Sequence, residues 1–230
     1  MEKPILFNTQ MVKAILNGSK TQTRRLIKPQ PPCVLKKMTE GHHAGEWHLY
    51  RDSPMMNPTT NSPWGAQYLP PCQPGDVLWV RETWQHLFDH KGWRYEYKAD
   101  YNDDEPLKLG GMYIAWRPSI HMPREAARLF LMVKDVRIER LQDMKMSDIQ
   151  AEGVVPSDVI GGQWQQWQRN YMKPVWDNTI KPVDLPCYGW DANPWVWVIE
   201  FERLDGKPAG LWADRDTAQF GDQDVLMPAT

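Results

Sequence analysis

The chain has 230 residues, a formal net charge of −2 at pH 7 and a pI near 6.3. This length allows a sizeable buried core, and the near-neutral charge argues against a protein that binds nucleic acid mainly through a basic excess. The sequence has no run of about 18 apolar residues, and its start reads as a helix pattern broken by polar side chains. We therefore expect a cytoplasmic protein with no membrane span, no membrane partner and no signal peptide.

The composition also bears on metals and on redox state. Three widely separated cysteines lack any C-x-x-C pairing, which is typical of reduced thiols: Cys33, Cys72 and Cys187. Two groups of histidines have short spacings, namely His42, His43 and His48, and then His86 and His90. Because no cysteine stands near the first group at a finger-like spacing, and Glu46 is its only adjacent carboxylate, we predict neither a metal site nor a cofactor.

The first predicted element is a short amphipathic helix that starts after Asn8 or Thr9, both of which are good N-cap residues. Apolar residues recur at helical spacing over 11–16, and Gly18 stands where a left-handed residue would end the helix. Residues 17–25 then read as a turn rich in hydroxyls and cations, followed by a strand that soon stops at a proline.

The turn over 17–25 has three interpretations from its residues alone. A threonine hydroxyl becomes a good nucleophile when a base takes its proton, and a lysine can be that base when burial or neighbouring cations lower its pKa. Lys20, with Arg24 and Arg25 as neighbouring cations, fits this requirement. The same three cations suit a clamp for a phosphate or a carboxylate. The third interpretation is a helix-to-strand connection with solvated basic residues.

The chain from 29 to 71 is irregular and rich in X-Pro pairs, apart from a short strand predicted over 47–50. A connection of this length inside a compact domain is typical of a lid, a binding loop or a disordered segment. A buried strand follows over 77–80, after a Pro-Gly-Asp turn, and runs into a charged stretch. Alternating residues predict further strands over 93–97 and 112–116.

The second half of the chain holds the strongest strand pattern. Residues 127–141 predict one long strand with a bulge near Asp135, and Ser147 is a candidate cap for a short helix that Gly153 ends. The mixture of strands and short helices predicts an α+β domain with a curved or closed sheet. Three further segments are predicted beyond the short helix: a helix over 162–172, a final strand over 195–202 and a tail over 204–230.

Four separated pieces of the sequence resemble the ASCH family, a branch of the PUA-like superfamily, and more closely its long phage and prophage members. The most specific piece is G-S-K-T-Q-T-R-R at 18–25. The others are P-G-D-V-L-W-V-R-E at 74–82, the strand over 129–141 followed by A-E-G at 151–153, and the strand over 195–201. The resemblance implies a PUA-like curved sheet or β-barrel with flanking short helices, formed by residues 1–203 with insertions at about 29–71, 85–117 and 156–190.

Compact members of this family are amidohydrolases that remove the acetyl group from N4-acetylcytidine with a lysine, a threonine and a glutamate. The matching residues here are Lys20, Thr23 and Glu152, with Glu82 as a substitute for the carboxylate. In one scheme Thr23 attacks the acyl carbonyl, Lys20 takes its proton, and Glu152 orients the lysine or protonates the leaving nitrogen. In the other scheme Lys20 and Glu152 activate a water and Thr23 only positions the substrate.

The resemblance also implies a cleft that takes a nucleoside, a nucleotide or RNA, in the cytoplasm of a bacterial host cell. For Arg81 and Glu82 the competing interpretation is a local ion pair. For Trp64 and Trp84, on or beside loops, stacking on a base competes with a place in the core. The alternative function is a non-catalytic RNA- or nucleotide-binding module, and the sequence makes no prediction of the oligomeric state. The candidate substrate-binding residues are Thr21, Arg24, Arg25, Arg81, Glu82, His121, Arg124, Trp64 and Trp84.

Overall fold

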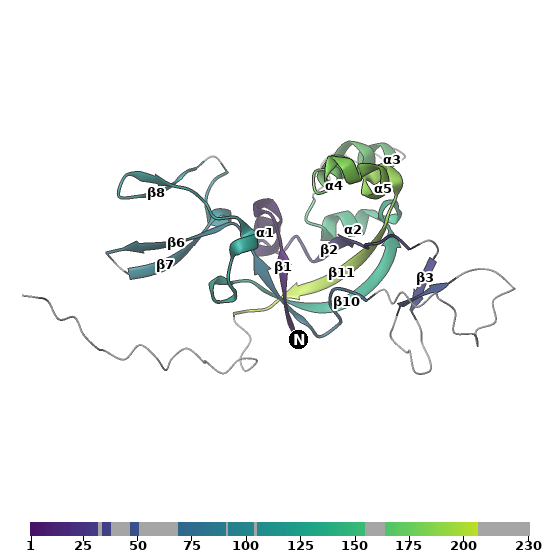
Figure 1. Cartoon of the computed structure of the whole chain (residues 1–230), viewed down its shortest axis with the longest axis horizontal. Helices are drawn as coiled ribbons and strands as arrows, with labels where there is room; N and C mark the ends of the chain where they lie inside the picture. Colours follow the sequence, from purple (N-terminus) through teal and green to yellow (C-terminus); the bar gives the residue numbers. More distant parts are fainter. Residues whose placement is uncertain are drawn as a thin grey trace, which may run out of the picture.

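A computed structural model describes residues 1–31, 34–37, 47–50, 69–90, 92–103, 105–154 and 164–206 of the chain (Figure 1). These residues form an α+β fold, which confirms the predicted class. Among them, no helix is long and apolar enough to cross a membrane. The main sheet has the strand order β1-β5-β10-β11-β2 and consists of β1 (Glu2–Leu6), β5 (Val77–Arg81), β10 (Phe130–Arg140), β11 (Trp195–Arg203) and β2 (Gln22–Leu26).

The two longest strands of the sheet, β10 and β11, pair antiparallel. Their register shifts between Val133 and Asp135, which confirms the predicted bulge. Side chains of β11 alternate between two hydrophobic clusters, because Trp197 lies in one cluster and Val198 in the other. The strand is therefore buried on both faces, which explains its continuous apolar sequence.

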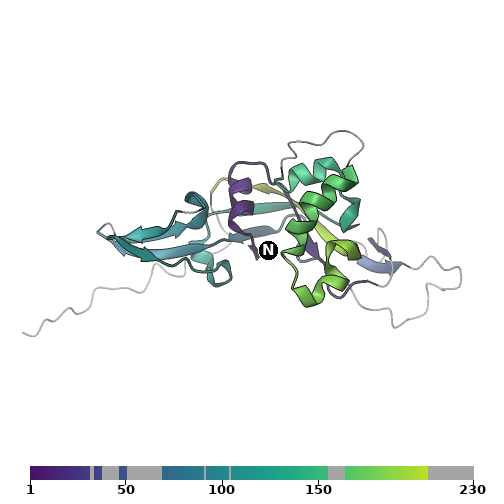
Figure 2. The same ribbon diagram turned by 90° about the horizontal axis from the view of Figure 1, so that it is seen from above.

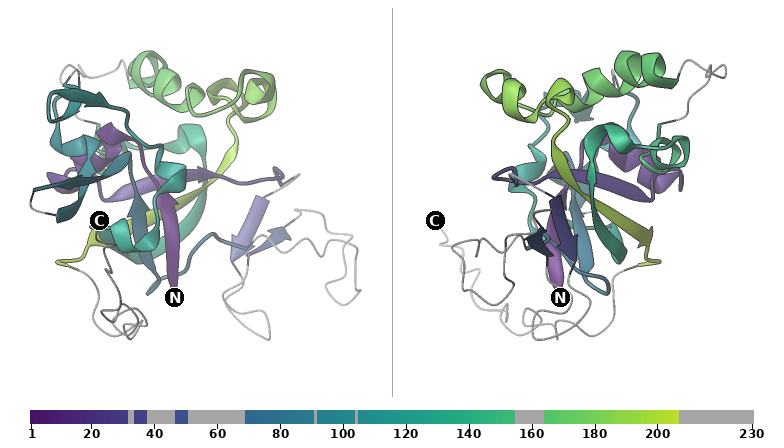
Figure 3. Two further views of the ribbon diagram at one scale, coloured as in Figure 1. Left: turned by 60° about the vertical axis from the view of Figure 1, so that its left-hand side comes forward. Right: turned by 90° about the vertical axis from the view of Figure 1, so that its right-hand side faces the viewer.

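The two edge strands of the sheet are β1 and β2. The sequence pattern does not predict β1, which pairs in parallel with β5 and carries Pro4. Proline is tolerated at a sheet edge because its missing N–H is not needed there for pairing. The sheet curves (Figure 3), and the guanidinium of Arg25 in β2 donates a hydrogen bond of 2.6 Å to the carbonyl of Leu6 in β1. One side chain thus links the opposite edges of the sheet.

The first helix, α1 (Thr9–Leu16), has the predicted caps. The side chain of Asn8 accepts a hydrogen bond from the N–H of Met11 at 2.8 Å, and Gly18 is left-handed with φ of +81°. The predicted turn over 17–25 is too long, because β2 already begins at Gln22. The apolar strand β11 offers this polar segment a complete hydrogen-bonding partner, and tertiary pairing outweighs its weak strand propensity.

Residues 84–117 form an arm of two hairpins that projects from the sheet (Figures 1 and 2). Strands β7 and β9 confirm two sequence predictions, whereas the pattern does not predict β6. The register of β6 and β7 places three pairs of rings on one face of the arm: Trp84 with Tyr97, His86 with Tyr95 and Phe88 with Trp93. The two-stranded sheets of the fold pair β6 (Trp84–Asp89) with β7 (Gly92–Tyr97), β8 (Leu107–Leu109) with β9 (Met112–Ile114), and β3 (Val34–Lys37) with β4 (Trp47–Tyr50).

A group of short helices covers one face of the main sheet (Figure 3) and is called the helical layer below. The helix predicted over 162–172 extends further, to Asp177, because Pro174 lies in the first turn of α4, where its missing N–H is not needed. The predicted cap Ser147 is wrong, since α2 begins at Met146 and the Asp148 carboxylate accepts a 2.8 Å hydrogen bond from the N–H of Lys145. The layer comprises α2 (Met146–Ala151), α3 (Trp164–Trp167), a π-helical turn (Gln168–Met172), α4 (Lys173–Asp177) and α5 (Leu185–Tyr188).

Asp76, at the entry to β5, gives the fold a pH-dependent contact. Burial alone would raise the pKa of this carboxyl, but hydrogen bonds from the Met1 ammonium and the Gln73 amide, together with Lys3 at 3.0 Å, lower it from 3.8 to about 2. A lowered pKa stabilises the folded state above the unfolded value, and this stabilisation is lost as pH falls from about 4 toward 2. We expect Asp76→Asn to reduce the free energy of unfolding at pH 7 by about 1–2 kcal/mol and to flatten its decline below pH 4.

The measurement for Asp76 is urea denaturation between pH 2.5 and pH 7. Asp103→Asn is the matched control, because Asp103 pairs with Lys13 at 2.9 Å on an exposed surface. The control should show no measurable change at pH 7. An Asp76→Asn curve parallel to that of the wild type below pH 4 would contradict the assignment.

Candidate active site

The predicted lysine lies where the turn after α1 meets the end of α2. The backbones of Lys20 and Glu152 form an isolated antiparallel bridge, and the N–H of Thr21 donates to the carbonyl of Ala151 at 2.8 Å. Gly153, with φ of +83°, packs so closely that an added Cβ would lie 2.7 Å from the Cβ of Ala14. The fold thereby joins two segments that are 132 positions apart in sequence.

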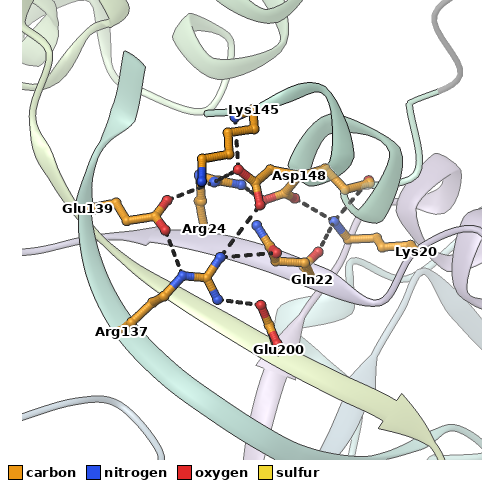
Figure 4. Close-up of polar contacts among 9 residues, drawn as sticks. Lys20, Gln22, Arg24, Arg137, Glu139, Lys145, Asp148 and Glu200 are labelled. Carbon is orange, nitrogen blue, oxygen red and sulfur yellow. Dashed lines mark hydrogen bonds and ion pairs between the residues drawn. The ribbon is translucent and has the colours of Figure 1, made fainter. Parts of the chain in front are cut away.

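The ammonium group of Lys20 is fully enclosed, with a side chain that is 0% exposed. It donates hydrogen bonds to the carbonyl of Gln22 (2.8 Å), the carbonyl of Glu152 (3.1 Å) and the Oε2 atom of Glu152 (2.7 Å) (Figure 4). Burial lowers the pKa of Lys20 below its ordinary value, the Glu152 carboxylate opposes this shift, and the charges of Arg25 and Arg24 reinforce it. A buried lysine with a lowered pKa beside a carboxylate is suited to proton transfer.

Glu152 is shared between two buried cations. Its Oε1 atom accepts a hydrogen bond of 3.1 Å from Arg24, whose side chain is only 2% exposed. Arg24 also pairs with Glu139 (3.0 Å) and Asp148 (3.5 Å), and Arg137 continues the chain of ion pairs to Glu139, Asp148 and Glu200 (Figure 4). We call this set of paired residues the ion-pair network. Because three carboxylates surround Arg24, its charge is already balanced within the protein.

Thr23 lines a pocket of about 260 Å³ between β2, α1 and the helical layer. This volume is near the lower end of the roughly 300–1,000 Å³ that small-molecule sites span, so a single nucleoside is a suitable size of ligand. Thr23 is buried, with 2% of its surface exposed. Glu152 also lines the pocket, whereas Lys20 does not. The remaining lining residues are Met11, Arg24, Arg25, Leu26, Lys28, Met144, Met172, Val175, Trp176, Thr179, Ile180 and Trp190.

Four of the predicted site residues line this pocket, namely Thr23, Arg24, Arg25 and Glu152. Lys20 lies next to it, because its ammonium group binds Glu152. The proximity of Lys20 and Thr23 follows from their spacing, because both lie in one short motif. Glu152 comes from a different element, and its neighbour Asp148 lies one helical turn earlier on the same face of α2. That four-residue spacing is the sequence signal by which Asp148 can be found. Arg137 and Glu139 carry no comparable local signal, since only strand pairing brings them to the site.

Several other candidates lie away from the pocket. Arg81 and Glu82 do not form the predicted ion pair, because the buried Glu82 carboxylate binds Arg128 through two hydrogen bonds of 2.9 and 3.0 Å. Arg124 is held by two hydrogen bonds to Glu2, at 2.8 and 3.0 Å. These arginines and carboxylates are partnered within the fold, and none of them lines the pocket at Thr23.

The remaining candidates have different surroundings. Trp84 is the first residue of β6 and is only 4% exposed, so its ring belongs to the core rather than to an open stacking surface. Thr21 lines a separate pocket beside α2, and His121 is exposed on a short 3-10 helix. Trp64 lies outside the described residues.

Metal ligands and thiols are the other groups for which the sequence made predictions. Among the residues that the structure describes, no three His, Cys, Asp or Glu side chains lie together as a metal site. Cys72 and Cys187 are free thiols in the described part of the chain. Cys33, His42 and His43 lie outside it. Comparison of the chain with family models, curated proteins and solved structures finds no match to any of them.

Proposed function

We propose that this protein is an amidohydrolase that removes an acyl group from a modified pyrimidine nucleoside or nucleotide of the N4-acetylcytidine type. One observation carries the proposal: the Glu152 carboxylate lines the Thr23 pocket and at the same time binds the buried Lys20 ammonium at 2.7 Å. The pocket is therefore lined by a threonine and a glutamate, and the carboxylate of this glutamate binds a lysine with a lowered pKa. These are the groups that acyl transfer requires.

The proposal includes a PUA-like barrel of the ASCH type as the scaffold. The sheet curves, and its edge strands approach each other closely enough for Arg25 of β2 to reach the Leu6 carbonyl of β1. Such an approach of the first and last strands supports a partly closed barrel. Short helices flank the sheet, as the resemblance to this family leads us to expect.

The geometry favours a scheme in which Glu152 is the group that meets the substrate. Glu152 would take a proton from the attacking oxygen, either the Thr23 hydroxyl or a water, as that oxygen adds to the acyl carbonyl. The same proton would pass to the N4 nitrogen when the C–N bond breaks, which releases the free amine. Lys20 does not line the pocket, so its role would be to hold and polarise the Glu152 carboxylate. If Thr23 is the nucleophile, water then hydrolyses the acyl-threonine.

The apolar wall of the pocket suits the flat base of the proposed substrate. Met172 and Trp176 line it from the helical layer, and Met144 and Trp190 line it from the segments just before α2 and just after α5. The Trp176 indole N–H donates to the Tyr188 carbonyl at 2.8 Å, which fixes the orientation of this ring. Aromatic and thioether side chains bind heterocycles through dispersion and stacking.

The test is hydrolysis of N4-acetylcytidine to cytidine and acetate, followed by chromatography. We expect Thr23→Val and Lys20→Met each to lower kcat/KM by about 100-fold. Thr83→Val is the control and should retain activity, because Thr83 lies between β5 and β6 and does not line the pocket. Circular dichroism should verify that each variant folds. An acetyl group trapped on Thr23 in a single turnover would identify Thr23 as the nucleophile.

A second function, a non-catalytic RNA- or nucleotide-binding module, is favoured by one observation. All three N–H donors of Lys20 are satisfied within the protein, as in a purely structural ion pair. Saturable binding of cytidine without any turnover by the wild type would support this module over the hydrolase. Turnover that persists in both Thr23→Val and Lys20→Met would show that these residues do not form the catalytic site.

A further inference from the structure

Arg25 differs from Arg24, the other arginine at the pocket, in forming no ion pair with a carboxylate of the described residues. No carboxylate of the described residues forms an ion pair with it, whereas its neighbour Arg24 pairs with three. Its single hydrogen bond goes to the neutral carbonyl of Leu6, at 2.6 Å, and its guanidinium lies 5.1 Å from the centre of the Phe7 ring. A guanidinium has five N–H donors, so most of the hydrogen-bonding capacity of Arg25 is unused.

The surroundings of Arg25 make an unpaired positive charge energetically unfavourable. Its side chain is half-buried, and burial lowers its pKa, although the charge of Glu152, which forms no ion pair with it, opposes this shift and the guanidinium stays protonated. Buried cations in proteins are normally paired with an anion, because removal of an unpaired charge from water is costly. An arginine that lines a pocket without such a partner is therefore suited to an anion supplied by a ligand.

Lys28 provides a second unpaired cation at the same pocket. It lies three residues after Arg25, and its ammonium group is 4.8 Å from the ring centre of Tyr188 in α5. None of the described carboxylates forms an ion pair with Lys28. Two cations that form no ion pair with a described carboxylate thus line the pocket, in addition to the mutually balanced charges of Arg24 and Glu152.

Strand β2 places Thr23, the proposed catalytic residue, close to Arg25. Thr23 and Arg25 are two residues apart, so their side chains leave the same side of the strand with Cα atoms separated by about 7 Å. We infer that Arg25 and Lys28 form an anion subsite of the pocket and that the ligand is a phosphorylated pyrimidine nucleotide. The identity of the base rests on the proposed function, whereas the anion subsite rests on the contacts of Arg25 and Lys28 alone.

The test compares three probes by isothermal titration calorimetry: cytidine, cytidine 5′-monophosphate and inorganic phosphate. We expect the wild type to bind the monophosphate at least about 10-fold more tightly than cytidine, and to lose this preference as salt rises. Arg25→Gln and Lys28→Gln should each reduce the preference for the monophosphate over cytidine several-fold. Because Lys28 is exposed, Lys28→Gln keeps the test valid even if Arg25→Gln folds poorly.

The matched control is Arg203→Gln. Arg203 also donates one hydrogen bond to a neutral carbonyl, that of Leu16 at 2.9 Å, but it does not line the pocket. This control should retain the full preference for the monophosphate. Equal affinity of the wild type for cytidine and its monophosphate, or no binding of either phosphate probe at millimolar concentration, would overturn the inference. Binding of phosphate through Arg25 without hydrolysis of N4-acetylcytidine would instead support the anion subsite and contradict the proposed hydrolase function.

Discussion

Glu152→Gln is expected to lower the free energy of unfolding by about 3–5 kcal/mol at pH 7. The change keeps the shape of the side chain and removes the charge that Lys20 and Arg24 share. Their side chains are 0% and 2% exposed, so neither cation can turn to water when its partner becomes neutral. Chemical denaturation in urea, monitored by tryptophan fluorescence, measures this loss.

Two further variants separate a buried network from ordinary surface charge. Glu202→Gln removes a carboxylate that pairs with Lys134 at 2.7 Å, where both side chains are about half exposed, and should cost less than about 1 kcal/mol. Adding Lys20→Met to Glu152→Gln should recover part of the lost stability, because it removes the buried cation that loses its carboxylate, whereas Arg24 keeps Glu139 and Asp148. Equal losses for Glu152→Gln and Glu202→Gln would contradict the buried pairing.

Gly153→Ala is expected to destabilise the protein by about 2–5 kcal/mol, which combines two separate costs. The backbone at Gly153 has φ of +83°, a conformation that residues with a Cβ rarely adopt. The new Cβ would also lie 2.7 Å from the Cβ of Ala14 and 3.1 Å from that of Lys20. We expect the end of α2 to move away from Lys20, so the proposed hydrolysis should fall together with the thermal midpoint.

Gly18→Ala is the control that isolates the backbone cost. Gly18 has nearly the same φ, +81°, but an added Cβ there meets no atom within 4 Å. Its loss should be about 1–2 kcal/mol, and hydrolysis should be retained. Ala14→Gly in the Gly153→Ala background should relieve the contact and recover stability, although glycine in α1 has a cost of its own. A loss at Gly153 no larger than the loss at Gly18 would show that the close packing is unimportant.

Local patterns in the sequence predict much of the fold, because they depend on residues that are neighbours in the chain. The cap at Asn8, the bulge near Asp135 and the left-handed Gly18 are of this kind. By contrast, β1 and β6 depend on partners elsewhere, and the start of β2 at Gln22 is set by pairing with β11. The sequence cannot reveal these partners without knowledge of the strand order.

The candidate site likewise combines residues that a local pattern predicts with residues that only tertiary contacts reveal. Lys20 and Thr23 are predictable because one short motif holds both. Glu152 is reached only through family resemblance, and the pairing of Glu82 with Arg128 replaces the local pair that the sequence favours. Which arginine is available for a ligand cannot be read from the sequence, since Arg24 and Arg25 are adjacent and chemically identical. Their difference arises entirely from the carboxylates that α2 and β10 bring to Arg24.

The free edge of β1 has a consequence for self-association. An edge strand offers backbone groups to which a strand of another molecule can add, and this is a common route to aggregation. Here Pro4 removes one donor from that edge, the charged Lys3 flanks it, and the guanidinium of Arg25 occupies the Leu6 carbonyl. The same arginine that we assign to ligand binding thereby also shields the sheet against the addition of a foreign strand.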